Sequence, residues 1–212
     1  MENRLYALLT SVLLFYGFAG AQNWRDSLAA LNRQIELQPQ STDLRLKKAA
    51  VNIELQQWEY AAEEYGRVLE LDDKNLAALY FRAYTYNHLR RYDLARADYE
   101  HFLHILPRHF DAQLGLAMTL RNLNRVQNTQ NQLNQLVEMF PDSALAYASR
   151  AAFEQEQHQY ELALYDWDEA LRLSPLHPEY MRSKYDVLLA LKRKDEARRL
   201  RMELRRMGYD SR

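Results

Sequence analysis

Three histidines near the middle of the chain have the residue type and spacing closest to a metal site. His101 and His104 are three residues apart, which would bring two imidazoles to one side of a helix, and His109 follows them. Imidazole nitrogens are common zinc ligands, but neither an HExxH motif nor a group of carboxylates completes the set. We therefore expect these histidines on the outer face of a helix, and we predict no metal and no other cofactor.

The rest of the sequence lacks the motifs of common catalytic sites. There is no cysteine, which excludes disulfides, thiol nucleophiles and cysteine-bound zinc. The chain has no nucleophile elbow, phosphate-binding loop or dinucleotide-binding motif. Its formal net charge of −1 gives no general attraction to nucleic acid. These observations predict a protein that is not an enzyme and does not bind nucleic acid.

The spacing of the prolines indicates which elements organise the chain. Pro39, Pro107, Pro141 and Pro175 are separated by whole multiples of a 34-residue period, and Asp73 occupies the vacant position. A fixed period of this length is typical of proteins built from stacked repeats. Glycine and proline are scarce, at five each, which favours long helices over hairpins.

Residues of one chemical type recur at this 34-residue spacing. Steps of three and four residues between the recurring positions place them along one side of an α-helix. A small residue recurs at Ser27, Ala61, Ala95, Thr129, Ala163 and Ala197, and a bulky one at Leu31, Tyr65, Tyr99, Leu133 and Trp167. An earlier stripe in each repeat contains Ala49, Ala83, Ala117 and Ala151. Each repeat is therefore predicted to be a pair of helices, and neighbouring pairs must stack to bury their apolar faces.

Polar residues between the helix pairs are expected to cap the helices that follow. The turns Gln40-Ser41, Lys74-Asn75 and Asp142-Ser143 each end in a residue whose side chain can accept a hydrogen bond from the first helical turn. Proline stands shortly before most of these turns, where it stops the preceding helix.

The recurring positions resemble the tetratricopeptide repeat family. The match is fullest in LYFRAYTYNHLRRYDLARADYEHFLHILP, which begins at Leu79, and in YASRAAFEQEQHQYELALYDWDEALRLSP, which begins at Tyr147. The resemblance implies an all-α fold, a right-handed α-solenoid of stacked antiparallel helix pairs. It places the segments as a lone helix at 22–41, repeats at 42–75, 76–109, 110–143 and 144–177, and a capping pair with a basic tail at 178–212.

The segment from Met1 to Ala21 has the composition of a signal peptide. Leu5 to Phe18 are almost wholly apolar, and Ala19-Gly20-Ala21 has the small-x-small pattern that precedes a signal-peptidase site. We predict cleavage after Ala21 and export, with the periplasm as the location. The alternatives are an uncleaved anchor and a buried first helix, although an apolar run of about 14 residues is short for a bilayer, which needs about 20.

Cleavage would leave the first repeat helix without its mate. Trp24, Leu28, Leu31 and Ile35 would then present apolar surface. We expect this edge either to repack against the next repeat or to pair with another subunit or partner.

The resemblance also implies a function, because first helices in this family line a concave groove that binds segments of other proteins. The matching positions in this chain are Tyr80, Tyr84, Asn87, Leu114, Met118, Arg121, Gln155, Arg182 and Asp186. For Tyr80 and Tyr84, the alternative to partner contact is packing against neighbouring helices. Leu46 and Ala50 cannot donate hydrogen bonds, so we expect no clamp for a C-terminal carboxylate. The chain is predicted to be a scaffold that binds a partner peptide or helix in the bacterial cell envelope.

Two segments suggest other surfaces. The uncharged polar run from Gln127 to Gln132 is either a solvated helix face or a partner surface. The stretch from Lys192 to Arg212 holds nine Lys/Arg and four Asp/Glu, so an alternative function is docking on an anionic membrane surface through the C-terminal helix. Asp195 and Glu203 interrupt its basic residues, which favours a solvated cap.

Overall fold

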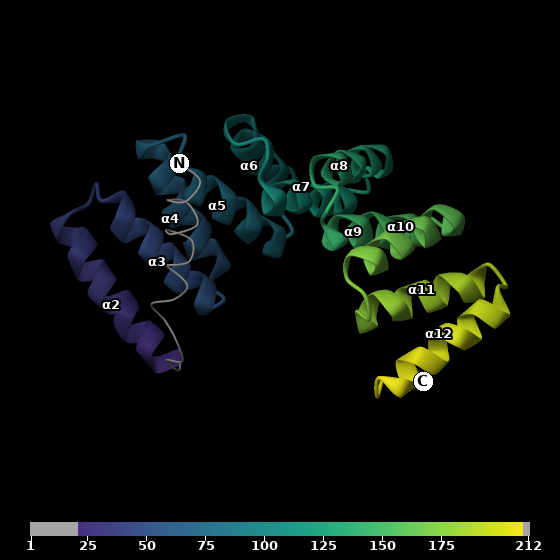
Figure 1. Ribbon diagram of the computed structural model, residues 1–212. Coiled ribbons are helices and arrows are strands. Elements are labelled where there is room, and N and C mark those ends of the chain that lie inside the picture. The colour runs from purple at the N-terminus through teal and green to yellow at the C-terminus, as the bar shows by residue number, and fades with distance from the viewer. Residues whose placement is uncertain (1–20, 210–212) are drawn as a thin grey trace. The chain divides into compact units, whose positions relative to one another are not determined.

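The computed structural model describes residues 21–209, so all but the last residue of the predicted signal segment lie outside the described residues. Within residues 21–209 the regular elements are α-helices (Figure 1). Their bounds are α2 Ala21–Leu37, α3 Thr42–Glu54, α4 Trp58–Leu71, α5 Leu76–His88, α6 Tyr92–Ile105, α7 Phe110–Asn122, α8 Val126–Met139, α9 Ala144–Glu156, α10 Tyr160–Leu173, α11 Pro178–Ala190 and α12 Lys194–Arg206. No described helix is long and apolar enough to cross a bilayer.

First helices begin at a side-chain cap that recurs at the repeat spacing in α3, α5, α7 and α9, whereas α11 begins after His177 without such a cap. Ser41, Asn75 and Ser143 accept hydrogen bonds from backbone N–H groups three residues later, at 3.4, 3.1 and 3.3 Å. The capping predicted at these three residues is confirmed. His109 occupies the same position before α7, where its Nδ1 accepts from the N–H of Ala112 at 3.2 Å.

The same helices end at a residue in the left-handed conformation. Gln56, Arg90, Asn124, His158 and Lys192 have φ between 55° and 60°, and each stands one repeat after the one before it. After Gln56, Arg90, His158 and Lys192, the next N–H bonds to a carbonyl five residues back, as Gln57 does with Asn52 at 2.8 Å. This arrangement satisfies carbonyls at the helix end and turns the chain into the second helix.

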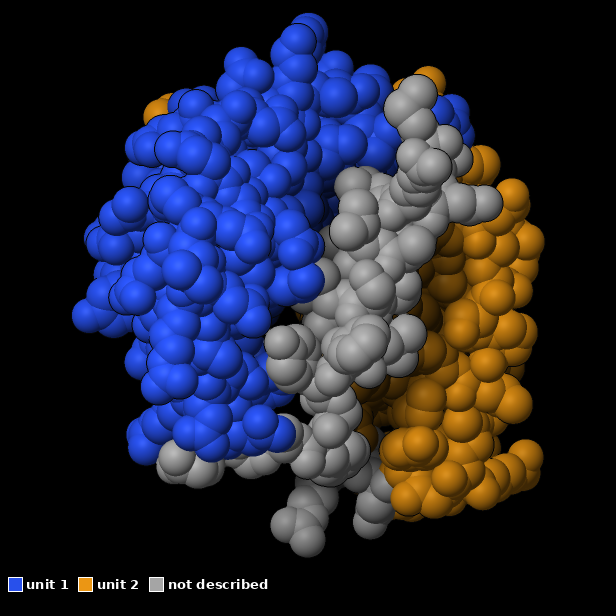
Figure 2. All heavy atoms as spheres, turned by 90° about the vertical axis from the view of Figure 1, so that its left-hand side faces the viewer, with its two compact units in different colours: residues 1–124 blue, residues 125–212 orange. Residues whose placement is uncertain are grey.

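The chain divides into two compact units, coloured separately in Figure 2. Unit 1 comprises residues 1–124, with described helices α2 to α7, and unit 2 comprises residues 125–212, with described helices α8 to α12. Inside each unit, consecutive helices pack against each other: α3 on α4 and α5 on α6 in unit 1, and α9 on α10 and α11 on α12 in unit 2. The prediction of an all-α fold of stacked helix pairs is confirmed.

The core of unit 1 combines small and aromatic side chains at the recurring positions. One cluster contains Ala49, Ala61, Tyr65, Val68 and Ala78, and the next contains Leu79, Ala83, Tyr99, Phe102, Ala112, Leu116 and Leu120. The alanines let helices approach closely and the rings fill the space beside them. Helix α2 packs along α3, with Leu31 buried and Trp24, Leu28 and Ile35 half-buried.

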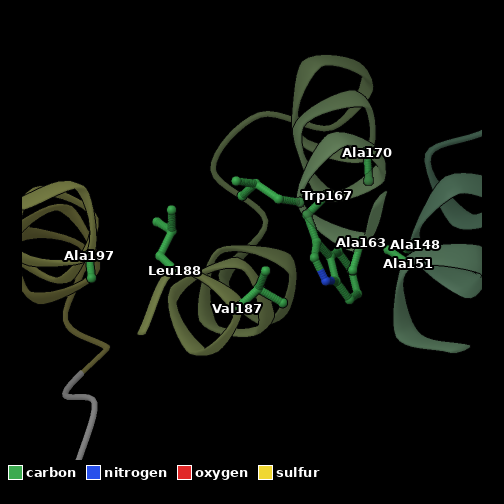
Figure 3. Close-up of a cluster of buried hydrophobic side chains, with 9 residues drawn as sticks. Ala148, Ala151, Ala163, Trp167, Ala170, Val187, Leu188 and Ala197 are labelled. Atoms are coloured by element: carbon green, nitrogen blue, oxygen red, sulfur yellow. The ribbon is translucent and has the colours of Figure 1, made fainter. Parts of the chain in front are cut away.

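The core of unit 2 follows the same plan around Trp167. Figure 3 shows the indole directed from α10 into a cluster that includes Ala151, Ala163 and Val187. Each of these four side chains is at most 4% exposed. Full burial of a large apolar side chain contributes about 1.5–3 kcal/mol. Leu164 and Leu188 belong to the same cluster, so unit 2 is held by several large side chains packed among alanines.

Helix α8 forms although Thr129 replaces the alanine that is usual at this repeat position. Thr129 is fully buried, and its hydroxyl donates to the carbonyl of Arg125 at 3.0 Å, which satisfies the added polar atom. On the same helix, Gln127 donates to Asn131 at 3.0 Å, and both side chains are exposed. Amide pairs one turn apart therefore account for part of the polar run on α8.

Candidate functional site

The nine predicted partner-binding residues lie on first helices but are divided between the two units. Unit 1 holds Tyr80, Tyr84 and Asn87 on α5 and Leu114, Met118 and Arg121 on α7. Unit 2 holds Gln155 on α9 and Arg182 and Asp186 on α11. The two sets differ in how many of their side chains already have partners.

Tyr80 is part of the packing between helix pairs. Its ring lies 5.9 Å from Tyr99, 5.8 Å from Phe102 and 5.8 Å from His109, centroid to centroid. Burial raises the pKa of Tyr80 to about 12, and the nearby carboxylate of Asp111 adds to the shift. Half-buried and held by three rings, this side chain chiefly fills the core of unit 1.

Tyr84 is 38% exposed and belongs to a group of three rings, here called the Trp58 cluster. The Trp58 indole stacks on the His88 imidazole, with centroids 4.0 Å apart and planes 2° apart. The Tyr84 ring meets Trp58 at 6.3 Å and His88 at 4.6 Å, edge to face. The cluster joins α4 to α5 and leaves aromatic surface accessible. Sequence reasoning missed His88 as a member of this surface, although Tyr84 and His88 are one helical turn apart.

Asn87 bonds within unit 1. Its Nδ2 donates to Thr119 Oγ1 at 2.9 Å, and Thr119 also bonds to the carbonyl of Gly115 at 2.7 Å. Thr119 is fully buried. The amide thus links α5 to α7, and its polar atoms are engaged in that link rather than directed only outward.

Leu114 and Met118 form a half-buried pair one turn apart on α7, and Arg121 lies one turn further on and is exposed. The position of α7 depends on Gly115, because a Cβ there would lie 2.6 Å from the ring of Tyr99. This close approach explains why the first helix of this repeat needs a glycine. Together with Tyr84, the pair gives unit 1 an accessible surface of aromatic, aliphatic and thioether groups.

The predicted binding residues of the second unit are more polar. Gln155 Oε1 accepts a hydrogen bond from Trp167 Nε1 at 3.3 Å, which fixes the indole in the core. Arg182 and Asp186 are exposed one turn apart on α11. Partial loss of solvent raises the pKa of Asp186, and the Arg182 charge opposes that shift. This surface suits a polar partner rather than an apolar one.

The three histidines considered at first do not come together as a ligand set. His109 is buried and caps α7, while His101 is half-buried and His104 is exposed. Among residues 21–209 there is no group of three His, Asp or Glu side chains that could hold a metal ion. The expectation of an outer-face position was wrong for His109, because a cap residue points inward to the helix it begins.

Comparison with known proteins agrees with this architecture. No family model matches the chain. The chain superposes on a tetratricopeptide repeat protein from Parabacteroides merdae with a TM-score of 0.75 and 15% identity, over 90% of this chain and 75% of that one. It superposes on YrrB, a TPR protein with an unusual peptide-binding site, with a TM-score of 0.63 and 18% identity, over 82% and 90%. The chain has the tetratricopeptide-repeat fold.

Two further similarities fit this fold. PilF from Pseudomonas aeruginosa superposes with a TM-score of 0.71 and 16% identity, over 99% of this chain and 95% of that one. In sequence, a DnaJ homolog subfamily C member 7 homolog from Dictyostelium discoideum is 22% identical over 221 residues, or 81% of this chain. This tetratricopeptide-repeat chain spans only 41% of that relative's length.

Within the tetratricopeptide repeats, an ion pair recurs between the two helices of a pair. Arg82 bonds to Asp98 through two hydrogen bonds of 2.7 Å, and Arg150 bonds to Asp166 at 2.6 and 2.8 Å. Each pair spans 16 residues, and both aspartates are buried. Lys48 makes the corresponding contact in the first repeat, with Glu64 at 2.8 Å. These pairs stabilise the helix hairpins, and sequence reasoning missed them although both members recur at the 34-residue spacing.

Glu154 is a buried carboxyl beside the Arg150–Asp166 pair. It is 4% exposed, and its Oε1 lies 4.0 Å from Arg150 Nε and 3.3 Å from Gln130 Nε2. Burial, with a further contribution from Asp166, raises the pKa of Glu154 to about 7. The Glu154 carboxyl therefore changes its charge near neutral pH.

Proposed function

We propose that the protein is a non-catalytic scaffold that binds a segment of a partner protein on the first-helix surface of unit 1. The observation that carries the proposal is the accessible row formed by the Trp58 cluster, Leu114 and Met118. These side chains are aromatic, aliphatic or thioether groups, which give adaptable contact area at protein interfaces. YrrB, which shares the fold, is described as having a peptide-binding site.

The proposed surface is narrower than the nine residues predicted from sequence. Tyr84, Leu114, Met118 and Arg121 are the residues of unit 1 assigned to partner contact. Tyr80 and Asn87 support that surface from beneath through the contacts described above. Such a surface suits a segment with an apolar or aromatic side chain.

The test is capture of partners by tagged protein carrying Tyr84→Ala and Met118→Ala. We expect a loss of most of the captured partner, because both changes remove accessible contact area while the buried core stays intact. The matched control is Tyr60→Ala with Tyr165→Ala, since these tyrosines are 61% and 63% exposed on second helices. Equal capture by both double variants and the parent protein would overturn the assignment. Circular dichroism melting establishes that all three are folded.

The proposed site of action is the bacterial cell envelope, after export. The support is the apolar segment from Leu5 to Phe18 and the small residues that follow it. Mass spectrometry of protein purified from cells tests this location. A chain that begins at Gln22 supports export with cleavage, and a chain that still begins at Met1 excludes cleavage. The capture experiment is then performed on the envelope fraction.

A further inference from the structure

Helix α4 exposes a row of carboxylates that is interrupted by a glycine. Glu59, Glu63 and Glu70 lie seven and three residues before Gly66 and four residues after it, which places all four on one side of the helix. All three glutamates are exposed, and within the described residues none forms an ion pair. Glu64, on the inner side, is buried in ion pairs. The outer face of α4 therefore carries three exposed glutamates that make no direct ion pair with a described residue.

Gly66 leaves a furrow in this face. Two adjoining hollows of about 330 and 530 Å³ both include Gly66 and Glu70 in their walls. A Cβ at residue 66 would meet only Arg82, at 3.7 Å, so the space above the glycine is open. Ala62 and Leu69 give the furrow an apolar floor. Arg82 is already neutralised by its buried aspartate partner.

The furrow keeps an acidic rim although two other arginines lie near it. Glu59, Glu63, Glu70 and Asp73 line its walls, against Arg67 and Arg91. The furrow is thus an apolar slot with excess negative charge at its edges. A complementary partner has one apolar side chain surrounded by positive charge.

Helix α12 has such a surface. Met202 is 47% exposed, and arginines lie three and four residues away on both sides of it. These four residues, all exposed, are Arg198, Arg199, Arg205 and Arg206. Residues at these spacings surround a central side chain on a helix. The opposite side of α12 is buried through Ala197 and Leu204, so the methionine and its arginines face outward.

We propose that α12 of one copy of the protein binds α4 of a second copy, with Met202 in the furrow above Gly66. Arg198, Arg199 and Arg206 then meet Glu63 and Glu70 on the furrow rim. Exposed ion pairs are individually weak and are screened by salt, so this contact is reversible and favoured at low ionic strength. The contact uses α12 and the part of α4 around Gly66, whereas the partner-binding surface proposed above lies on α5 and α7 together with Trp58 at the start of α4.

Sedimentation velocity of the full chain tests the association. At about 50 mM salt we expect the average mass to rise with protein concentration from about 1 to about 200 µM, and at about 500 mM salt we expect the rise to disappear. A monomer at every concentration and both salt levels overturns the proposal.

Reversal of charge identifies the two faces. Glu63→Arg with Glu70→Arg, and separately Arg198→Glu with Arg206→Glu, should each weaken self-association about tenfold or more. An equal mixture of the two reversed proteins should associate again, because each then offers the face that the other needs. Restored association also shows that both variants are folded. If the mixture stays monomeric, the pairing of α4 with α12 is wrong.

Two controls separate this pairing from a general charge effect and from lipid binding. Glu100→Arg with Glu138→Arg reverses exposed charges on α6 and α8 and should leave association unchanged; an equal loss would reveal a general charge effect and contradict the proposal. Flotation with anionic vesicles tests the alternative use of the basic face. Vesicle binding that Arg198→Glu with Arg206→Glu abolishes, in a chain that remains monomeric, would assign α12 to a lipid surface instead.

Discussion

Arg82 in unit 1 and Arg150 in unit 2 occupy equivalent repeat positions and make the same two hydrogen bonds to a buried aspartate. Their second neighbours differ. Arg82 lies over the ring of Tyr86, with its guanidinium carbon 5.7 Å from the centroid, whereas Arg150 has Glu154 in the equivalent place. One arginine therefore balances one carboxylate in unit 1 and two in unit 2.

This difference shows how a single repeat position changes the acid–base behaviour of an unchanged fold. In unit 1 the neighbour is aromatic, and a buried group with a shifted pKa is a base, His109. Burial lowers the pKa of His109, and Asp111 opposes that shift. In unit 2 the corresponding group is an acid, Glu154, whose pKa is raised. The two units should therefore respond to pH in opposite directions.

Replacing the arginine should give the largest difference in stability loss between the two units. Arg150→Met leaves Asp166 and Glu154 buried without a cation, and we expect a loss of about 3–5 kcal/mol. Arg82→Met leaves only Asp98, which is 6% exposed, and should cost less, about 2 kcal/mol. Urea unfolding of both variants at neutral pH measures the difference. Equal losses would show that Glu154 does not depend on Arg150.

The Glu154 carboxyl should make unit 2 less stable as the pH rises. Because its pKa is raised in the folded protein, the unfolded chain loses this proton first, and stability declines from about pH 4.5 until the pH passes about 7. Glu154→Gln removes that decline and should stabilise unit 2 by on the order of 2 kcal/mol at about pH 7.5. Hydrogen exchange in α9 and α10, corrected for the intrinsic rate, reports the effect. A variant with an unchanged pH profile would contradict it.

The His109 cap should make unit 1 less stable as the pH falls. Its Nδ1 accepts a hydrogen bond only when unprotonated, and its lowered pKa means that the unfolded chain takes up the proton first, below about pH 6.5. His109→Asn keeps a cap of the kind present at Asn75 and should abolish this acid sensitivity, while the cap itself is worth about 1 kcal/mol. Hydrogen exchange in α7 at about pH 5.5 and 7.5 tests this; equal acid sensitivity of the variant and parent would refute it.

Substitution of glycine at the left-handed positions should change stability least. The change should again differ between the two units. Arg90→Gly relieves the left-handed strain of an exposed residue and should stabilise unit 1 by about 0.5–1 kcal/mol. His158→Gly relieves the same strain but loses the contact between His158 Nδ1 and Tyr160 Oη at 2.8 Å, so we expect almost no gain. Thermal melting compares the two variants. A larger gain for His158→Gly would mean that the contact has no value.

The sequence predicted the repeated helix pairs because their apolar and small residues recur with a fixed period. It also predicted the caps at Ser41, Asn75 and Ser143, which depend on local backbone geometry. It could not show that Asn87 bonds to Thr119 or Gln155 to Trp167, since both bonds join different helices. The assignment of the nine residues to partner binding stays a prediction. The Arg–Asp pairs could have been found, because both partners recur with the same period.

The left-handed residues at the ends of the first helices give the chain a set of attachment points. Gln56, Arg90 and Asn124 in unit 1, and His158 and Lys192 in unit 2, are all exposed and spaced by one repeat. These positions need a positive φ, but they do not need a particular side chain. Because the chain has no cysteine, a single thiol introduced at any of them would be unique in the molecule. Pairs of spin labels at Gln56 and Arg90, or at His158 and Lys192, would measure the repeat-to-repeat distance inside each unit in solution.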